Sequence, residues 1–328
     1  MAMILAGDIG GTKTSLASFA VEGDTLVART VQSYPSNKHG NLVEIVREFL
    51  RDARHDVRFA AFGIAGPVVN GRCTATNLPW TVDTRELAPA LGLQKVGLIN
   101  DLEATAYGIL RLPHTELLML NAGSAAPEGT IAVIAAGTGL GEGGLVWNGS
   151  RYQALPSEGG HADFAPRTEL EIQLLRFLMK TYKRVSYERV VSGMGIINLY
   201  QFFRTQVSYP EPRWLADEMA AGDKAAAISD AALKGKDEAC LRAMELFVAL
   251  YGAEAANLAL KFLATGGVYI AGGIAPKILP LLQQSTFMDS FSNKGRFSSL
   301  VKSLPVYVVL NENAALYGAA HYALLMNG

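Results

Sequence analysis

The sequence predicts an α/β fold in two lobes, each of which presents a glycine-containing turn between two strands. The chain has 328 residues, enough for one large domain or two of moderate size. Strand and helix patterns alternate along much of it, as in α/β proteins. Residues 4–19 and 131–147 share one plan, in which two apolar strands flank a turn that contains Gly and Thr. Because these segments lie in different halves, they suggest two related lobes.

The first part of the chain is expected to open with three strands and to continue as alternating strands and helices. Strands are predicted at residues 3–7, on both sides of Gly23-Asp24 within 14–34, at 59–69 and at 95–101. Helices are predicted at residues 41–54, 84–92 and 102–110. The helix at 41–54 has the clearest pattern, since Leu42, Val46 and Phe49 fall on one helical face.

The rest of the chain is expected to be richer in helix. A strand, a glycine turn and a second strand are predicted across residues 130–147. Helices are predicted at residues 170–182, 187–203 and 239–263. A buried strand with a glycine turn is predicted within 266–276, and a strand followed by a helix within 304–325.

Composition limits the classes of partner. The formal net charge is −1, so no global charge favours nucleic acid or an anionic membrane surface. Cys73 and Cys240 are the only cysteines, and their spacing suits neither a disulfide framework nor a cysteine-based metal site. The start lacks a basic region, and no stretch approaches the roughly 20 apolar residues of a membrane span. These features predict a cytoplasmic protein.

The first glycine turn, GDIGGTKT at residues 7–14, is close to a Walker phosphate loop but differs from it. Thr12 stands where the Walker pattern needs its second glycine, and a strand follows where that loop needs a helix. We therefore predict a hairpin turn in which the Gly10 and Gly11 amides approach a phosphate. Asp8 fits such a site if Mg²⁺ bridges carboxylate and phosphate oxygens. The alternative is a tight hairpin that needs its glycines only for backbone conformation.

The second glycine turn resembles a dinucleotide-binding pattern. Gly139, Gly141 and Gly144 satisfy G-x-G-x-x-G, and Glu158 lies near the expected distance of a ribose-binding acid. That fingerprint requires a helix to follow, whereas a strand and a turn are expected here, so the dinucleotide interpretation fails. A turn lined by glycines and Thr138 would instead form the second half of a phosphate clamp.

Three further segments carry polar or glycine residues at strand ends and in loops. Asn100 and Asp101 follow an apolar strand just before a helix, where α/β proteins usually bind ligands; the alternative is that Asp101 is only an N-cap. Glu158 and His161 lie in a glycine-rich loop that suits hydrogen bonding to a polyhydroxy ligand better than a metal site. Glu188 by itself is typical of a helix-surface charge. Gly272-Gly273 ends a buried strand and offers a flat surface for an adenine or ribose.

Taken in chain order, these segments resemble the bacterial glucokinases of the hexokinase–actin–Hsp70 superfamily. The resemblance rests on GDIGGTKT and AAGTGLG as phosphate motifs, IND as the sugar and catalytic motif, SEGGHADF and YERVVSG as sugar-binding segments, and AGGIAPK as the adenosine motif. It implies a two-lobed actin-like ATPase (ribonuclease H-like) fold with a cleft, a small α/β lobe at residues 1–111 plus 309–328 and a larger α+β lobe at 112–308. The implied reaction is ATP-dependent phosphorylation of the 6-hydroxyl of glucose, giving glucose 6-phosphate and ADP.

The resemblance also implies roles for single residues. Asp101 would be the base that deprotonates the 6-hydroxyl. The remaining sugar contacts are assigned to Asn100, Glu158, His161, Glu188 and Asn77. Phosphate, adenosine and Mg²⁺ binding are assigned to Gly7, Asp8, Ile9, Gly10, Gly11, Thr12, Gly137, Thr138, Gly139, Gly272 and Gly273. Asp8 would organise Mg²⁺ through water, while Lys13 receives no definite role.

The resemblance further predicts a homodimer with glucose and ATP as substrates. No zinc is expected, because the cysteine cluster that accompanies the His161 position in the repressor–kinase branch is missing. Three alternatives remain open: a non-catalytic sugar sensor, a protein-remodelling ATPase of the actin or Hsp70 type, and a kinase for another hexose such as mannose or fructose.

Overall fold

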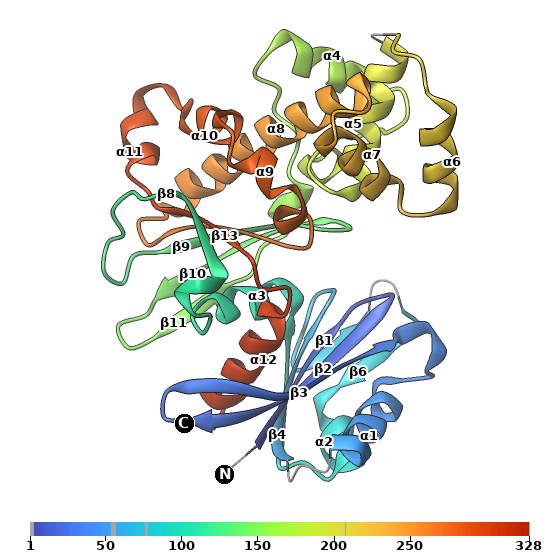
Figure 1. The fold of residues 1–328 in the computed structure, drawn as a ribbon. Helices are drawn as coiled ribbons and strands as arrows, with labels where there is room; N and C mark the ends of the chain where they lie inside the picture. The colour runs from blue at the N-terminus through green and yellow to red at the C-terminus, as the bar shows by residue number, and fades with distance from the viewer. Residues whose placement is uncertain (1–2, 54–56, 76–77, 207, 328) are drawn as a thin grey trace. The chain divides into compact units, whose positions relative to one another are not determined.

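A computed structural model describes residues 3–53, 57–75, 78–206 and 208–327, and these form two compact units. The first unit comprises Met1–Glu116, Ala154–Pro156 and Asn311–Gly328. The second comprises Leu117–Gln153 and Ser157–Leu310. Each unit is built around one main β-sheet and has its own core (Figure 1).

The sheet of the first unit has the order β3-β2-β1-β4-β7. Its strands are β1 (Met3–Ile9), β2 (Lys13–Glu22), β3 (Thr25–Pro35), β4 (Val57–Ile64) and β7 (Lys95–Asn100). β1, β2 and β3 pair antiparallel, while β4 and β7 continue parallel to β1. The predicted opening of three strands followed by strand–helix alternation is confirmed.

Side-chain alternation along β1 explains why helices cover both faces of this sheet. Leu5 and Ile9 pack with residues of α1 (Leu42–Ala53) and α2 (Thr84–Leu91). Ile4 and Ala6 point the other way and pack with α12 (Ala314–Leu325). Apolar residues on both faces are typical of strands in a sheet covered on both sides.

The helices α3 (Asp101–Ile109) and α12 cross at very close range. A Cβ at Gly108 would lie 1.9 Å from the carbonyl oxygen of Ala314, and one at Gly318 would lie 1.6 Å from that of Ala104. The contact is reciprocal, because both helices carry the same spacing of Ala, Tyr and Gly. In the chain, α3 follows β7 of this sheet, whereas α12 follows β13 (Val306–Val309) of the second unit's sheet.

The sheet of the second unit repeats this plan. Its order is β11-β10-β9-β12-β13-β8. The strands are β8 (Leu117–Asn121), β9 (Ile131–Ala136), β10 (Leu140–Trp147), β11 (Tyr152–Leu155), β12 (Gly267–Ala271) and β13 (Val306–Val309). β9 and β10 pair antiparallel, whereas β12 and β13 run parallel to β9, as β4 and β7 run parallel to β1. The two related lobes expected from the repeated turns are therefore present as two sheets of matching order.

Helices dominate the remainder of the second unit. They are α4 (Glu169–Leu178), α5 (Gly193–Gln206), α6 (Arg213–Ala221), α7 (Lys224–Leu233), α8 (Glu238–Phe262), α9 (Leu279–Leu282), α10 (Ser285–Ser292) and α11 (Ser298–Lys302). In Figure 1 they lie over one side of the sheet, where α8 runs through the core. Ala132 and Ile134 of β9 point into that core.

α8 also bears on the prediction about membrane spans. Among the described residues it is the one helix long and apolar enough to cross a membrane by length and composition. The expectation that no segment approaches that criterion is therefore wrong. Of the apolar window in α8, 78% is buried inside the structure, as expected of a core helix.

Two groups of elements differ from the sequence prediction. The helix expected at 187–203 is interrupted: Tyr187–Arg189 form a 3₁₀ turn and α5 begins only at Gly193. The physical reason is a cap, because the Ser192 hydroxyl accepts a hydrogen bond from the Gly195 amide at 3.0 Å. The pattern also missed β5 (Arg72–Thr74), β6 (Thr81–Asp83), β8, β11 and helices α6, α7, α9, α10 and α11. Strands of three residues are too short to show a period.

Candidate active site

The first glycine turn joins β1 to β2 as the sequence predicts. The Gly10 amide donates to the Lys13 carbonyl at 3.0 Å, which closes the hairpin. Ser36 supports the turn from outside: its amide donates to the Thr12 carbonyl at 3.0 Å and its hydroxyl donates to the Gly10 carbonyl at 2.8 Å. The Ser36 hydroxyl also lies 2.9 Å from that of Thr14. This buried serine fixes the turn, yet no motif in the sequence pointed to it.

Asp8 and Asp101 are neighbours in the first unit. Asp8 lies near the end of β1, and Asp101 begins α3. Gly63 of β4 permits this approach, since a Cβ there would lie 2.9 Å from the Ala104 side chain and 3.5 Å from the Asp101 Cα. Burial, reinforced by the Asp101 carboxylate and opposed by Lys13, raises the pKa of Asp8 to about 6.

Asn100, rather than Asp101, is the N-cap of α3. The Asn100 side chain accepts from the Leu102 amide at 2.9 Å and donates to the Gly66 carbonyl at 3.2 Å. Asp101 is the first helical residue, and its carboxylate also accepts from the Leu102 amide at 2.9 Å. The N-cap interpretation of Asp101 is therefore wrong by one residue. Asn100 has the extended backbone of an N-cap and its side chain accepts from the Leu102 amide, whereas Asp101 is already helical.

The Asp8 carboxylate has the chemistry of a Mg²⁺ site. Two neighbouring carboxylates repel one another, and the raised pKa of Asp8 reflects part of that repulsion. Oxygen ligands and a net negative charge are what Mg²⁺ prefers, often through retained water. Asp8 and its surroundings thus fit the metal that the sequence predicted there. Among the described residues, no group of three or more His, Cys, Asp or Glu side chains is arranged to hold a metal ion.

The second glycine turn joins β9 to β10 and is fixed by different partners. The Gly137 amide donates to the Gly139 carbonyl at 2.9 Å, and the Gly193 amide at the start of α5 donates to the Gly137 carbonyl at 2.8 Å. Glu188 accepts from the Leu140 amide at 3.1 Å. A Cβ at Gly139 would lie 2.5 Å from the same carboxylate oxygen, so an added methyl group would displace the end of the Glu188 side chain.

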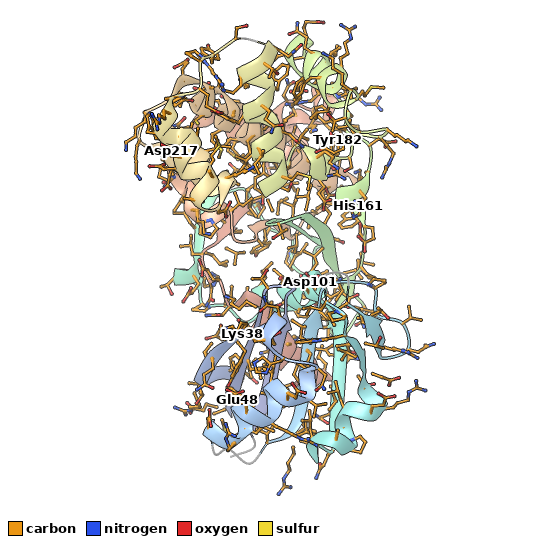
Figure 2. The ribbon with its side chains drawn as sticks, turned by 90° about the vertical axis from the view of Figure 1, so that its right-hand side faces the viewer. Lys38, Glu48, Asp101, His161, Tyr182 and Asp217 are labelled. Carbon is orange, nitrogen blue, oxygen red and sulfur yellow. The ribbon has the colours of Figure 1, made fainter. Side chains whose placement is uncertain are left out.

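The loop with Glu158 and His161 packs directly against this turn. A Cβ at Gly160 would lie only 2.0 Å from the Leu140 carbonyl oxygen. His161 Nε2 lies 3.9 Å from the Glu158 carboxylate, and His161 Nδ1 lies 3.9 Å from that of Glu188. His161 is exposed at the surface of this unit (Figure 2). The three polar side chains assigned to sugar binding in this unit are thus brought together.

The glycine pair after β12 meets the same turn from another direction. Gly272 has φ +84°, and a Cβ there would lie 2.3 Å from the Ala136 carbonyl oxygen. The Ile274 amide donates to that oxygen at 3.2 Å. Gly273 has open space where a side chain would be, so its backbone is free for a flat ligand to approach.

The structure therefore gathers the predicted residues of each unit into one place. In the first unit Asp8, the turn at residues 10–13, Asn100 and Asp101 lie at neighbouring strand ends. In the second unit three separate segments converge on the turn at residues 137–139. Thr12, Lys13 and Thr138 are exposed, which suits side chains at the tips of ligand-binding turns. Asn77 lies outside the described residues.

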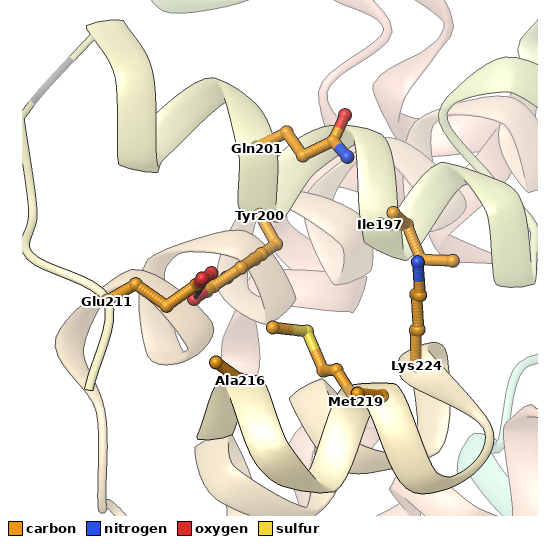
Figure 3. A pocket seen from close by; sticks show the side chains of 8 residues that line it. Ile197, Tyr200, Gln201, Glu211, Ala216, Met219 and Lys224 are labelled. Carbon is orange, nitrogen blue, oxygen red and sulfur yellow. Dashed lines mark hydrogen bonds between the residues drawn. The ribbon is translucent and has the colours of Figure 1, made fainter. Parts of the chain in front are cut away.

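A pocket of about 280 Å³ lies elsewhere in the second unit, among α5, α6 and α7 (Figure 3). It is lined by Ile197, Tyr200, Gln201, Glu211, Ala216, Met219, Ala220 and Lys224. The Tyr200 hydroxyl donates to Glu211 at 2.9 Å at its edge. No predicted site residue lines this pocket.

Comparison with known proteins agrees with this architecture. A glucokinase from an Antarctic psychrotroph has a TM-score of 0.87 and 33% sequence identity, with 100% of each chain covered. A ROK family glucokinase from Streptomyces griseus, solved in complex with glucose and AMPPNP, has a TM-score of 0.67 at 21% identity and covers 99% of this chain and 100% of its own. The second of these likenesses shows the fold alone.

The fold and these neighbours define the class of protein: a sugar kinase with the actin-like ATPase fold. The Glucokinase family model matches residues 5–326. A glucokinase from Nostoc sp. (strain PCC 7120) is 48% identical over 337 aligned positions, which cover 98% of each chain. The chain belongs to the glucokinase family.

Proposed function

We propose that this enzyme transfers the γ-phosphoryl group of ATP to the 6-hydroxyl of D-glucose, giving glucose 6-phosphate and ADP. The observation that carries the proposal is the position of Asp101, at the first turn of α3 and beside Asp8, in a chain of the glucokinase family. The Streptomyces griseus neighbour holds glucose and AMPPNP, an ATP analogue, on the same fold.

In this proposal Asp101 is the general base. Its carboxylate accepts the proton of the 6-hydroxyl as the sugar oxygen forms a bond to the γ-phosphorus. The bond between that phosphorus and the β,γ-bridging oxygen breaks, and ADP leaves with the bridging oxygen. Because such reactions depend mostly on position and charge, the protein needs no nucleophile of its own.

The other residues bind and orient the substrates. Asn100, Glu158, His161, Glu188 and Asn77 are proposed to bind the sugar hydroxyls, since amides, carboxylates and imidazole offer both donors and acceptors. Backbone amides at Gly10, Gly11, Thr12 and Gly137–Gly139 are proposed to donate to the phosphates, with Gly7 and Ile9 as their flanking backbone. Gly272 and Gly273 are proposed to lie against the adenosine. Asp8 would hold hydrated Mg²⁺, which when bound offsets phosphate charge.

A sugar panel tests this proposal most directly. Purified protein with ATP and Mg²⁺ is given glucose, mannose, fructose or no sugar, and both ADP release and the position of the new phosphate are measured. We expect the highest kcat/KM with glucose and phosphorylation at the 6-hydroxyl. ADP release that is equal without sugar would favour a remodelling ATPase, and glucose binding without turnover would favour a sensor.

The same preparation tests two of three further proposals. We infer a homodimer in the cytoplasm, without zinc. Light scattering would report the dimer mass, and metal analysis of the purified protein would report zinc.

A further inference from the structure

Glu142 is a buried acid that the proposed mechanism does not use. It lies in β10, two residues after Leu140, and only 1% of its surface is exposed. Neither carboxylate oxygen has a hydrogen-bond partner among the described residues. An unpartnered buried carboxylate is costly, so its presence needs a physical reason.

The Glu142 side chain lies against the backbone of the loop that carries Glu158 and His161. A Cβ built on Gly159 would lie 2.4 Å from the Glu142 carboxylate and 3.0 Å from the Glu142 Cβ. Gly159 is the residue between Glu158 and Gly160, and its carbonyl accepts the Ala162 amide at 2.8 Å. The carboxyl group of Glu142 therefore packs directly against the loop backbone at Gly159.

A second buried acid adds to the effect of burial on Glu142. Glu254 of α8 is fully buried, and its carboxylate accepts from Asn257 at 2.7 Å and lies 3.4 Å from Lys261 Nζ. Glu254 thus has a cation and a hydrogen-bond donor beside it, which Glu142 lacks. Burial, reinforced by Glu254 and opposed by Lys261, raises the pKa of Glu142 to about 8.

Other titratable groups surround the same pair. Lys294 donates to the Ala253 carbonyl at 3.0 Å and to the Asn257 side chain. Burial lowers the pKa of Lys294 to about 8, helped by Arg167 and opposed by Glu254. The Tyr187 and Tyr251 hydroxyls are buried nearby, and burial raises the pKa of both. Lys294 and Glu142 thus titrate in the same range, so a pH profile alone cannot separate them.

We propose that Glu142 is a positioning residue for sugar binding, and that it acts as an uncharged carboxylic acid packed beneath Gly159. In that state it holds the backbone that orients Glu158 and His161. This inference rests on the proposed function, in which those two side chains bind the sugar. Ionisation of Glu142 would add a buried charge close to the Glu254 carboxyl group and would disfavour the packing of Glu142 against Gly159.

Four variants test the role: Glu142→Gln, Glu142→Ala, Gly159→Ala and the double Glu142→Ala/Gly159→Ala. Glu142→Ala should raise the KM for glucose about tenfold, with kcat and the KM for ATP changed less than about twofold. Glu142→Gln keeps the shape without the charge, so its KM for glucose at pH 7 should stay within about threefold of the unmodified value. It should also abolish the rise in that KM that the unmodified enzyme shows above about pH 8. Gly159→Ala should raise the KM for glucose less in the Glu142→Ala background, where the carboxylate that its methyl group would meet is absent. The effects of the two substitutions on this KM should therefore differ from independence by about threefold or more.

Two matched controls separate positioning from general stability. Glu171 is another buried acid of this unit, 2% exposed and paired with Arg167 at 2.8 Å. Glu171→Gln should therefore lower the melting temperature. It should leave the pH dependence of the KM for glucose unchanged. Gly222 has open space at its Cβ position, so Gly222→Ala is the control for an added methyl group.

The outcomes for the two proposals differ. If the unmodified protein phosphorylates glucose but Glu142→Ala leaves the KM for glucose unchanged, or Glu142→Gln keeps the alkaline rise, the positioning role is wrong. The positioning role would also be wrong if the effects of Glu142→Ala and Gly159→Ala on the KM for glucose were independent of one another. If the unmodified protein phosphorylates no sugar, the proposed function itself fails, and glucose binding measured by calorimetry would still test whether Glu142 orients the loop.

Discussion

The two glycine turns occupy equivalent places in two sheets of matching order, yet they are held in different ways. The turn at residues 10–13 is braced by neutral hydroxyl groups, chiefly that of Ser36. The turn at residues 137–139 is braced by the Glu188 carboxylate and by the first amide of α5. One backbone plan therefore serves two environments, and the bracing residues decide what each turn can bind.

The acids beside the two turns differ in the same sense. Asp8 precedes the first turn, keeps part of its surface accessible and lies near both Asp101 and Lys13. Glu142 follows the second turn, is buried and has no hydrogen-bond partner among the described residues. In our proposal Asp8 of the first unit binds a hydrated cation, whereas Glu142 of the second unit is uncharged. In our proposal, chemistry belongs to the first unit and much of the sugar recognition to the second.

The largest effect is expected from removing the carboxylate at the start of α3. Asp101→Ala should lower kcat at least about 10²-fold while retaining measurable glucose binding, because the proposed base is lost and most sugar contacts remain. Steady-state kinetics and calorimetry with glucose would check both parts. Near-normal turnover would show that the first unit does not supply the base.

A methyl group in the second turn should have the next largest effect. Gly139→Ala places a Cβ 2.5 Å from the Glu188 carboxylate and should lower kcat/KM for glucose about 10- to 100-fold. Gly222→Ala is the control, since no atom lies within 4 Å of a Cβ there and the residue has no proposed role, and it should cost much less. Equal losses in the two variants would mean that the contact with Glu188 does not matter.

The acid beside the first turn should set a pH limit. The pKa of Asp8 is about 6 instead of 3.8, so activity should fall as the pH drops through 6 and the carboxylate loses its charge. The raised pKa also makes the unfolding free energy fall as the pH rises from about 4 to about 6, and the loss persists at higher pH. The reason is that the folded protein keeps a proton that the unfolded chain releases. Asp8→Asn should remove that loss.

The measurable consequence of Asp8→Asn is opposite for stability and activity. The variant should gain up to about 3 kcal/mol of unfolding free energy relative to the unmodified protein at pH 7.5, and almost nothing at pH 3.5. Its activity should be low at every pH and need more Mg²⁺. Denaturant unfolding and Mg²⁺ titrations at several pH values would check this; a gain that does not depend on pH contradicts it.

The smallest effect is expected at the hydroxyl that braces the first turn. Ser36→Ala leaves the Gly10 carbonyl without that donor and should cost about 1–2 kcal/mol, with a rise of a few fold in the KM for ATP. Ser15→Ala is the control, because Ser15 bonds the neighbouring strand through Ser33 at 2.9 Å. It should lower the melting temperature without changing the KM for ATP.

Much of the architecture was predictable because it depends on local patterns. The strand after the first turn follows from the β-branched and aromatic residues beyond Lys13, and it excludes a Walker loop. The same reasoning excluded a dinucleotide fold at the second turn, where β10 follows. The boundary of α5 was missed, because the Ser192 cap is recognisable only once the chain folds around Gly137.

The sequence by itself determined the two repeated strand–turn–strand units, the family and the residue types at each turn, because all of these depend on short-range periodicity and spacing. Only the tertiary structure decided which partners hold those turns. Ser36 reaches Gly10 across 26 positions of the chain, and Glu188 reaches Leu140 across 48. The neutral state of Glu142 likewise depends on burial beside Glu254, a residue of a distant helix. Burial and long-range contact set charge, and neither can be read from local spacing.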